Sequence, residues 1–147
     1  MGDLRNELRS MLLESNTKEA VGVLIMAEDS NKVLLLKRGF SPHKGHWSLL
    51  SGGMEEGESK LETLKREIME EAQIDADDKI DLTFIRTENN NGKLYHFYEG
   101  LTSNEIIPKL DEENTDWGWY SEDDLPTPLY PKTKEKIKEV CLKRKVK

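Results

Sequence analysis

The sequence predicts an α+β fold in which a mixed β-sheet is sandwiched between helices. Short β-rich runs occur both before and after one amphipathic segment at 59–72, and a second amphipathic segment closes the chain. Strands on both sides of a central helix have to share a core with it, which favours an α/β or α+β sandwich with mixed strand pairing. At 147 residues the chain fits one domain, spanning residues 1–147.

The first elements are expected to be an added helix and two strands. Apolar residues recur at helical spacing after Asp3, a good N-cap, and predict a short amphipathic helix over 4–14. The β-rich runs at 20–27 and 32–38 are separated by a polar turn, which predicts a hairpin or neighbouring strands. A loop containing Pro and Gly follows at 39–46.

The best-marked helix is expected at 59–72. Its apolar residues fall on one stripe: Leu61, Leu64, Ile68 and Ala72. Ser59 and Glu62 have the spacing of a capping box, in which each side chain binds the backbone of the other residue. The segment therefore has both a start signal and a face that can pack on a sheet.

The second half is expected to supply the remaining strands and a last helix. The runs at 82–88 and 93–101 flank Asn91-Gly92, a strong hairpin signal because both residues tolerate positive φ. Ile106-Ile107 and the run at 117–120 predict further short strands. A proline-containing loop then leads to a helix whose inner stripe would be Ile137, Val140 and Cys141.

Composition excludes several classes of protein. No apolar run approaches the roughly 18 to 20 residues that span a bilayer, so no membrane-embedded role is expected. The lone Cys141 cannot form an intramolecular disulfide and no signal-peptide pattern is present, which favours the cytoplasm. A net charge of −7 disfavours a broad nucleic-acid surface, although the C-terminal segment is basic. An acidic globule that takes a polyphosphate substrate would need bound cations.

Three glutamates cluster on the helix expected at 59–72. Glu67, Glu70 and Glu71 stand at i, i+3 and i+4, so they project from one side of that helix. The cluster could be a solvated acidic face. It could equally be a set of hard oxygen ligands for Mg²⁺ or Mn²⁺, because a cation would convert the repulsion between the carboxylates into coordination. The Gly-rich turn just upstream, Ser51-Gly52-Gly53, favours the second interpretation, since backbone can approach a metal or phosphate closely there.

The segment from Gly52 to Ile74 resembles the Nudix box. The family pattern is Gly, five residues, Glu, seven residues, then Arg-Glu-apolar-any-Glu-Glu-any-Gly-apolar, and it matches here except that Gln73 stands where the family has Gly. The upstream Trp47-Ser-Leu-Leu-Ser-Gly-Gly also resembles the family, with Leu50 in place of Pro. Gln73 is expected to cost about 1 kcal/mol at the helix end, or to change how the helix ends.

The resemblance implies a Nudix-like α/β/α sandwich and a set of site residues. Glu67, Glu70 and Glu71 would bind the metal, with the Ser51 carbonyl as a further ligand. Gly52 and Glu58 would brace the box, and Arg66 would join Glu58 while serving the catalytic machinery. The reaction would be attack of metal-activated water on a phosphorus atom of an anhydride, with Mg²⁺ or Mn²⁺ as cofactor.

Residues outside the box supply further candidates. Comparable proteins often draw another acidic ligand or base from a loop after the box, and Glu113 is the choice here, followed by Glu112; this loop could equally be a solvated acidic surface. Arg38, at the end of a strand, would meet a phosphate of the substrate. Tyr130, in the proline-bounded loop, would contact a nucleobase.

The expected substrate is a nucleoside di- or triphosphate, as in MutT-type enzymes, and it could be a modified nucleotide. ADP-ribose or another nucleotide diphosphate compound is the nearest alternative, followed by dinucleoside polyphosphates and capped RNA. A nucleotide-binding module without catalysis is the alternative from another class, although all four box glutamates are present. The protein could act as a monomer or a homodimer.

Overall fold

The computed structural model describes residues 18–146, so the helix expected at 4–14 lies outside the described residues. Seven strands of the described part form one sheet in the order β3-β2-β1-β6-β5, with β4 also paired to β1 and β7 to β2. The strands are β1 (Glu19–Ala27), β2 (Val33–Arg38), β3 (Trp47–Ser48), β4 (Leu50–Gly53), β5 (Asp81–Asn90), β6 (Lys93–Thr102) and β7 (Asn114–Tyr120). The helices are α2 (Lys60–Ala72), α3 (Ala76–Lys79) and α4 (Thr133–Val146).

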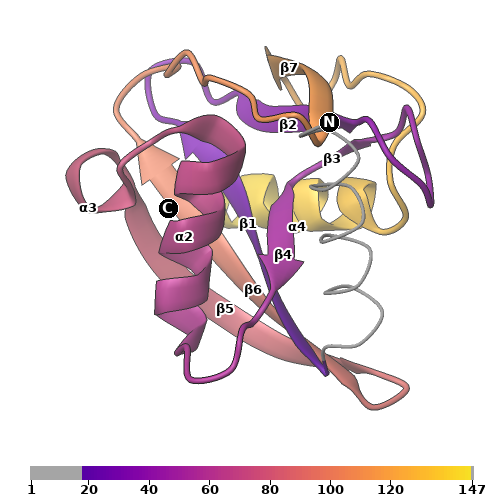
Figure 1. Cartoon of the computed structure of the whole chain (residues 1–147). Coiled ribbons are helices and arrows are strands. Elements are labelled where there is room, and N and C mark those ends of the chain that lie inside the picture. Colours follow the sequence, from indigo (N-terminus) through magenta and orange to yellow (C-terminus); the bar gives the residue numbers. More distant parts are fainter. Residues whose placement is uncertain (1–17, 147) are drawn as a thin grey trace.

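The sheet is mixed, as the sequence predicts. β1 and β6 are parallel, whereas β1 pairs with β2 and with β4 in the antiparallel sense. β5 and β6 form the expected hairpin, with positive φ at Asn91 and Gly92. Helix α2 covers one face of the sheet and α4 the other (Figure 1), so the predicted α+β sandwich is confirmed.

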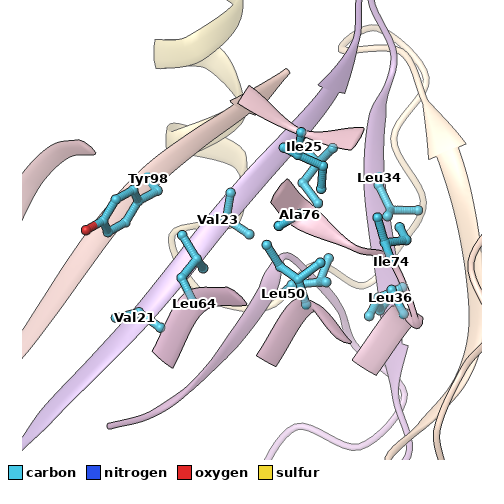
Figure 2. Close-up of a cluster of buried hydrophobic side chains, with 13 residues drawn as sticks. Val21, Val23, Ile25, Leu34, Leu36, Leu50, Leu64, Ile74, Ala76 and Tyr98 are labelled. Carbon is cyan, nitrogen blue, oxygen red and sulfur yellow. The ribbon is translucent and has the colours of Figure 1, made fainter. Parts of the chain in front are cut away.

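β1 is buried on both faces and therefore contributes to two cores. Its odd-numbered residues pack toward α2, and Figure 2 shows Val21, Val23 and Ile25 among the side chains of this first cluster. Its even-numbered residues Leu24 and Met26 pack toward α4. Because successive side chains of a strand point to opposite faces, β1 reads as a continuous apolar run and not as an alternation.

Helix α2 begins and ends where the sequence indicates. Ser59 caps the first turn, and both hydrogen bonds of the capping box with Glu62 are present. Gln73 ends the helix in the left-handed conformation, at φ 54° and ψ 43°, and its N–H donates to the carbonyl of Met69. A residue with a Cβ thus takes the backbone conformation that the family pattern assigns to glycine.

The strand expected at Ile106-Ile107 is wrong. Ile106 packs on the α2-side core and its carbonyl accepts a hydrogen bond from Trp119 Nε1 at 2.8 Å, whereas Ile107 is 79% exposed. The segment is held against the C-terminal end of α2, because the Lys109 N–H donates to the Ala72 carbonyl. Pro108 has no N–H to donate to a β-ladder, which also disfavours a strand here.

The sequence predicts helix α4 but not helix α3. The short helix α3, capped by Asp75, is not anticipated by the sequence analysis. The stripe predicted for the last helix is confirmed, since Ile137, Val140 and Cys141 are all buried in α4. None of the helices described between residues 18 and 146 combines the length and the apolar character needed to cross a membrane.

Candidate active site

Two of the three clustered glutamates of α2 are buried. Glu67 is 6% exposed and Glu71 7% exposed, while Glu70 is only partly buried. β4 passes directly over Glu67: a Cβ added to Gly52 would lie 2.1 Å from the carboxyl carbon of Glu67. Only glycine leaves room for a carboxylate at this point, so the box glycine Gly52 and the box glutamate Glu67 depend on each other sterically.

Arg66 connects the loop before α2 to the glutamates on the helix. Its Nε lies 2.7 Å from Glu58 Oε2, and its Nη2 donates to Glu58 Oε1 at 2.9 Å and to the Gly53 carbonyl at 3.2 Å. Its Nη1 donates to Glu67 Oε1 at 2.9 Å and to both oxygens of Glu70 at 3.3 Å. One guanidinium therefore holds the loop, the strand β4 and the carboxylate cluster together.

Glu71 is almost as fully buried as Glu67. Its Oε2 accepts a hydrogen bond from Asn114 Nδ2 at 3.3 Å, but its Oε1 is buried and has no hydrogen-bond partner among the described residues. Asn114 begins β7, and the sequence analysis does not single it out. A buried carboxylate oxygen without a partner is costly, and such an atom in a native protein points to a bound ion or water.

Burial and like charge move the pKa values of the buried glutamates upward. Burial raises the pKa of Glu67 to about 7; Arg66 opposes this shift, and the charges of Glu70 and Glu113 add to it. Burial also raises the pKa of Glu71 well above its usual value, with contributions from Glu67 and Glu113. Several carboxylates therefore lie in one small volume and repel one another when ionised. A bound cation would relieve this repulsion.

The acidic loop after the box lies near this cluster. Glu113, half-buried, is close enough to raise the pKa of both Glu67 and Glu71, and burial raises the pKa of Asp111 in the same loop. The Glu113 carbonyl accepts from the Gly39 N–H, which ties the loop to the end of β2. Glu112, the second choice from the sequence, is exposed.

The residues of this site suit a divalent cation. The donors are hard carboxylate oxygens, Glu71 Oε1 has no partner, and glycine at position 52 leaves room beside Glu67. In residues 18–146 no three acidic, histidine or cysteine side chains already converge on one point that could hold an ion. Instead of converging on a point where an ion could sit, the Glu67 and Glu70 carboxylates both accept hydrogen bonds from Arg66 Nη1.

A pocket of about 230 Å³ opens on the other face of the sheet, between β4, β5, β6 and the start of α4. Ser51 and Gly52 line one part of it, so β4 separates the pocket from the buried glutamates. Arg38 and Tyr130, both singled out from the sequence, line the pocket, and the Arg38 guanidinium lies 4.9 Å from the Tyr130 ring centroid. Phe40 contacts the guanidinium as well, at 4.2 Å.

The pocket also contains charged residues that the sequence analysis does not single out. Glu88 of β5 and Lys136 of α4 both line it, and Lys136 Nζ lies 3.5 Å from Glu88 Oε1. In the sequence Lys136 is one lysine among many in a basic segment. The sequence contains one indication that Lys136 differs from the other lysines. It comes directly before Ile137, a residue of the inner stripe, so it lies at the edge of the buried face of the helix.

A family model identifies the class of protein. The NUDIX domain model matches residues 16–141, which is most of the chain. Together with the mixed sheet and the glutamates of α2, this match shows that the chain belongs to the Nudix hydrolase family.

Individual relatives are distant. The chain is 28% identical to the human 8-oxo-dGDP phosphatase NUDT18 over 113 residues, which are 74% of this chain and 34% of that protein. It is 25% identical to a dihydroneopterin triphosphate diphosphatase of Haemophilus influenzae, covering 80% of this chain and 84% of the relative. It thus spans about a third of the length of the animal relatives that it matches.

The fold is shared with solved structures. The structure of a C. elegans Ap4A hydrolase in a binary complex superimposes with a TM-score of 0.71 at 22% identity, over 87% of this chain and 99% of that one. At this level of identity the likeness concerns the fold, because one fold can serve many substrates.

Proposed function

We propose that this protein hydrolyses a phosphoanhydride bond of a nucleoside di- or triphosphate, using Mg²⁺ or Mn²⁺. The observation that carries the proposal is the buried carboxylate cluster at the β4–α2 junction, in which Glu71 Oε1 has no partner among the described residues. Such a cluster is costly as a purely structural feature and is the donor set that a hard divalent cation requires.

Each residue of the cluster has a proposed task. Glu67, Glu70 and Glu71 would hold the cation, with the Ser51 carbonyl as a further ligand. When bound, the cation lowers the pKa of water and neutralises charge on the phosphate oxygens. Arg66 would keep Glu67 and Glu70 in place through its hydrogen bonds to both, while Glu58 and Gly52 brace the loop.

The proton of the attacking water needs an acceptor. Glu67 and Glu113 are the two candidates, since both carboxylates lie in this cluster and either could take the proton on a carboxylate oxygen. Two features favour Glu113 as the acceptor. Its loop is anchored by the hydrogen bond from the Gly39 N–H, and the loop is separate from the rigid helix α2 that carries Glu67.

The nucleoside would occupy the pocket on the other side of β4. Tyr130 offers a ring for stacking on a base, and the Arg38 guanidinium, held by its hydrogen bond to the Pro42 carbonyl, would meet a phosphate. The relatives whose names mention 8-oxo-dGDP and dihydroneopterin triphosphate support a nucleotide-like substrate with two or three phosphates.

The test is a panel of substrates assayed for phosphate or pyrophosphate release with Mg²⁺ and with Mn²⁺. It contains nucleoside di- and triphosphates, ADP-ribose, sugar nucleotides, dinucleoside polyphosphates and capped RNA. We expect metal-dependent turnover that is highest on a nucleoside di- or triphosphate and is lost in Glu70→Gln.

Other outcomes would reject the proposal in different ways. Highest turnover on ADP-ribose or on a dinucleoside polyphosphate would replace the substrate class but keep the reaction. Nucleotide binding without turnover on any member of the panel would identify a non-catalytic binding module.

A further inference from the structure

We propose that Lys136 and Glu88 form a base-reading pair, selecting a heterocycle that carries a carbonyl oxygen beside ring N–H and amino donors. Guanine, 8-oxoguanine and pterin rings have such an edge. The inference rests on the proposed function only in placing the base of a nucleotide in the pocket.

The location of the pair fits the far end of a nucleotide. Glu88 lies near the end of β5, and Lys136 lies one turn into α4. Helix α4 covers the face of the sheet opposite α2 (Figure 1). Ser51 and Gly52 line the same pocket and adjoin the glutamate cluster behind β4. A substrate whose phosphates reach the glutamates would extend its base toward Glu88 and Lys136.

Lys136 is an unusual lysine for this helix. It is 8% exposed, whereas Lys134 and Lys138 on the same helix are exposed. Its ammonium lies 5.3 Å from the ring centroid of Tyr95 and 5.6 Å from that of Phe97, so an apolar side chain could have filled this position. A buried ammonium costs desolvation free energy, and stability alone would favour methionine or leucine here.

The ammonium retains donors for a ligand. Its one ion pair in the described part of the chain, with Glu88 Oε1, is 3.5 Å long, beyond the 2.7 to 3.2 Å of an ordinary N–H···O hydrogen bond. A lysine carries three N–H donors, and the aromatic rings accept none of them in the ordinary sense. A carbonyl oxygen of a base is a suitable acceptor.

Glu88 is oriented to provide the complementary acceptor. Its Oε2 accepts from Arg86 Nε at 3.0 Å, and Arg86 is itself paired with Glu139 of α4. This fixes the carboxylate so that Oε1 is the oxygen that faces Lys136. Oε1 has two lone pairs with which to accept from the ring N–H and the adjacent amino group of a guanine-type edge, whereas adenine offers it the amino group alone.

The neighbouring carboxylate argues against a phosphate at Lys136. A phosphate placed on this ammonium would lie next to Glu88 and be repelled, so the pair is better matched to an uncharged group that has both donors and acceptors. Lys93 and Lys132 also line the pocket, but the selection proposed here does not involve them.

The experiment compares the binding of dGMP and dAMP to the full chain by isothermal calorimetry in the presence of Mg²⁺. Wild type is expected to bind dGMP more tightly than dAMP. In Lys136→Met the dGMP Kd should rise about tenfold or more, with little change for dAMP, because one charge-assisted hydrogen bond is lost. Glu88→Gln should also reduce the preference, and Lys134→Met, which changes an exposed lysine of the same helix, should keep it.

Thermal denaturation of each variant shows whether it is folded. Equal binding of dGMP and dAMP by wild type would overturn the inference, and so would an unchanged preference in folded Lys136→Met and Glu88→Gln. The substrate panel separates the two proposals: a dGMP preference without turnover would reject the enzyme and keep the pair, whereas turnover without base preference would do the reverse.

Discussion

Two carboxylates of the box have pKa values displaced in opposite directions. The hydrogen bonds from Arg66 lower the pKa of Glu58 to about 2, whereas burial raises that of Glu67 to about 7 although the same guanidinium contacts it. The difference lies in the surroundings: Glu58 accepts two hydrogen bonds from Arg66, one from the Glu55 N–H and one from Thr63, while Glu67 is enclosed beside Gly52. The ionised Glu58 carboxylate therefore stabilises the folded state, whereas burial of the ionised Glu67 carboxylate destabilises it.

The Glu58–Arg66 interaction predicts a specific pH dependence of stability. A carboxyl whose pKa is lower in the folded state stabilises the protein above its unfolded pKa, and this contribution is lost as pH falls toward the folded pKa. Wild type should therefore exceed Glu58→Gln in free energy of unfolding at pH 7, and the difference should shrink between the ordinary value of 4.5 and about 2.

Urea unfolding at several pH values measures this difference. Glu56→Gln is the matched control, because Glu56 is an exposed residue of the same loop and should show no such convergence. A difference between wild type and Glu58→Gln that stays constant down to pH 3 would contradict the assignment.

Some of these residues could be identified from sequence and others could not. The α2 glutamates, Arg66 and Glu58 lie in one continuous segment, where fixed helical spacing brings them together. Asn114 and Lys136 reach their partners Glu71 and Glu88 across 43 and about 50 residues of chain, so their contacts depend on how strands and helices assemble. Spacing along the sequence carries no information about such pairs.

Among the elements, the end of α2 is the least usual. Gln73 is exposed and takes a left-handed conformation that costs residues with a Cβ about 1–2 kcal/mol, partly offset by the entropy that glycine loses on folding. The Lys109 N–H supports this helix end by binding the Ala72 carbonyl. The segment after β6 thus serves α2 and is not a strand of the sheet.

Replacing Gln73 by glycine should stabilise the protein. We expect Gln73→Gly to raise the free energy of unfolding by about 0.5–1 kcal/mol, because the strain disappears and an exposed side chain contributes little packing. The corresponding rise in Tm would be about 2–4 °C.

Chemical denaturation of wild type and variant tests this expectation. Gln73→Ala keeps the Cβ and should gain nothing, so it separates backbone strain from the loss of the side chain. Destabilisation by Gln73→Gly would show that the Gln73 side chain holds the helix end.

Element prediction succeeded where a local signal exists. The capping box at Ser59 and the Asn91-Gly92 turn are such signals, and both elements form where they indicate. Ile106-Ile107 has the composition of a strand, but the adjacent Pro108 and the nearby end of α2 decide its conformation. Local propensity yields to tertiary contacts in short segments.

At the scale of the whole molecule, β1 and β4 divide the site into two halves. The carboxylate cluster lies on α2, the pocket is lined by residues of α4, and Gly52 borders both. The parallel pairing of β1 with β6 builds the centre of this arrangement, joining residues more than 70 positions apart. In β6, Tyr98 packs in the cluster on the α2 side and Phe97 in the cluster on the α4 side. The sequence alone does not predict this order of strands.

The most direct test of the central claim is metal-dependent turnover by Glu71→Gln on the best substrate of the panel. The claim predicts a loss of about 10²-fold or more with Mg²⁺, because a direct ligand should matter at least as much as the groups that orient one. Glu135→Gln, which changes an exposed glutamate of α4, should retain full activity, and thermal denaturation should show both variants folded. A folded Glu71→Gln with wild-type turnover would contradict the account.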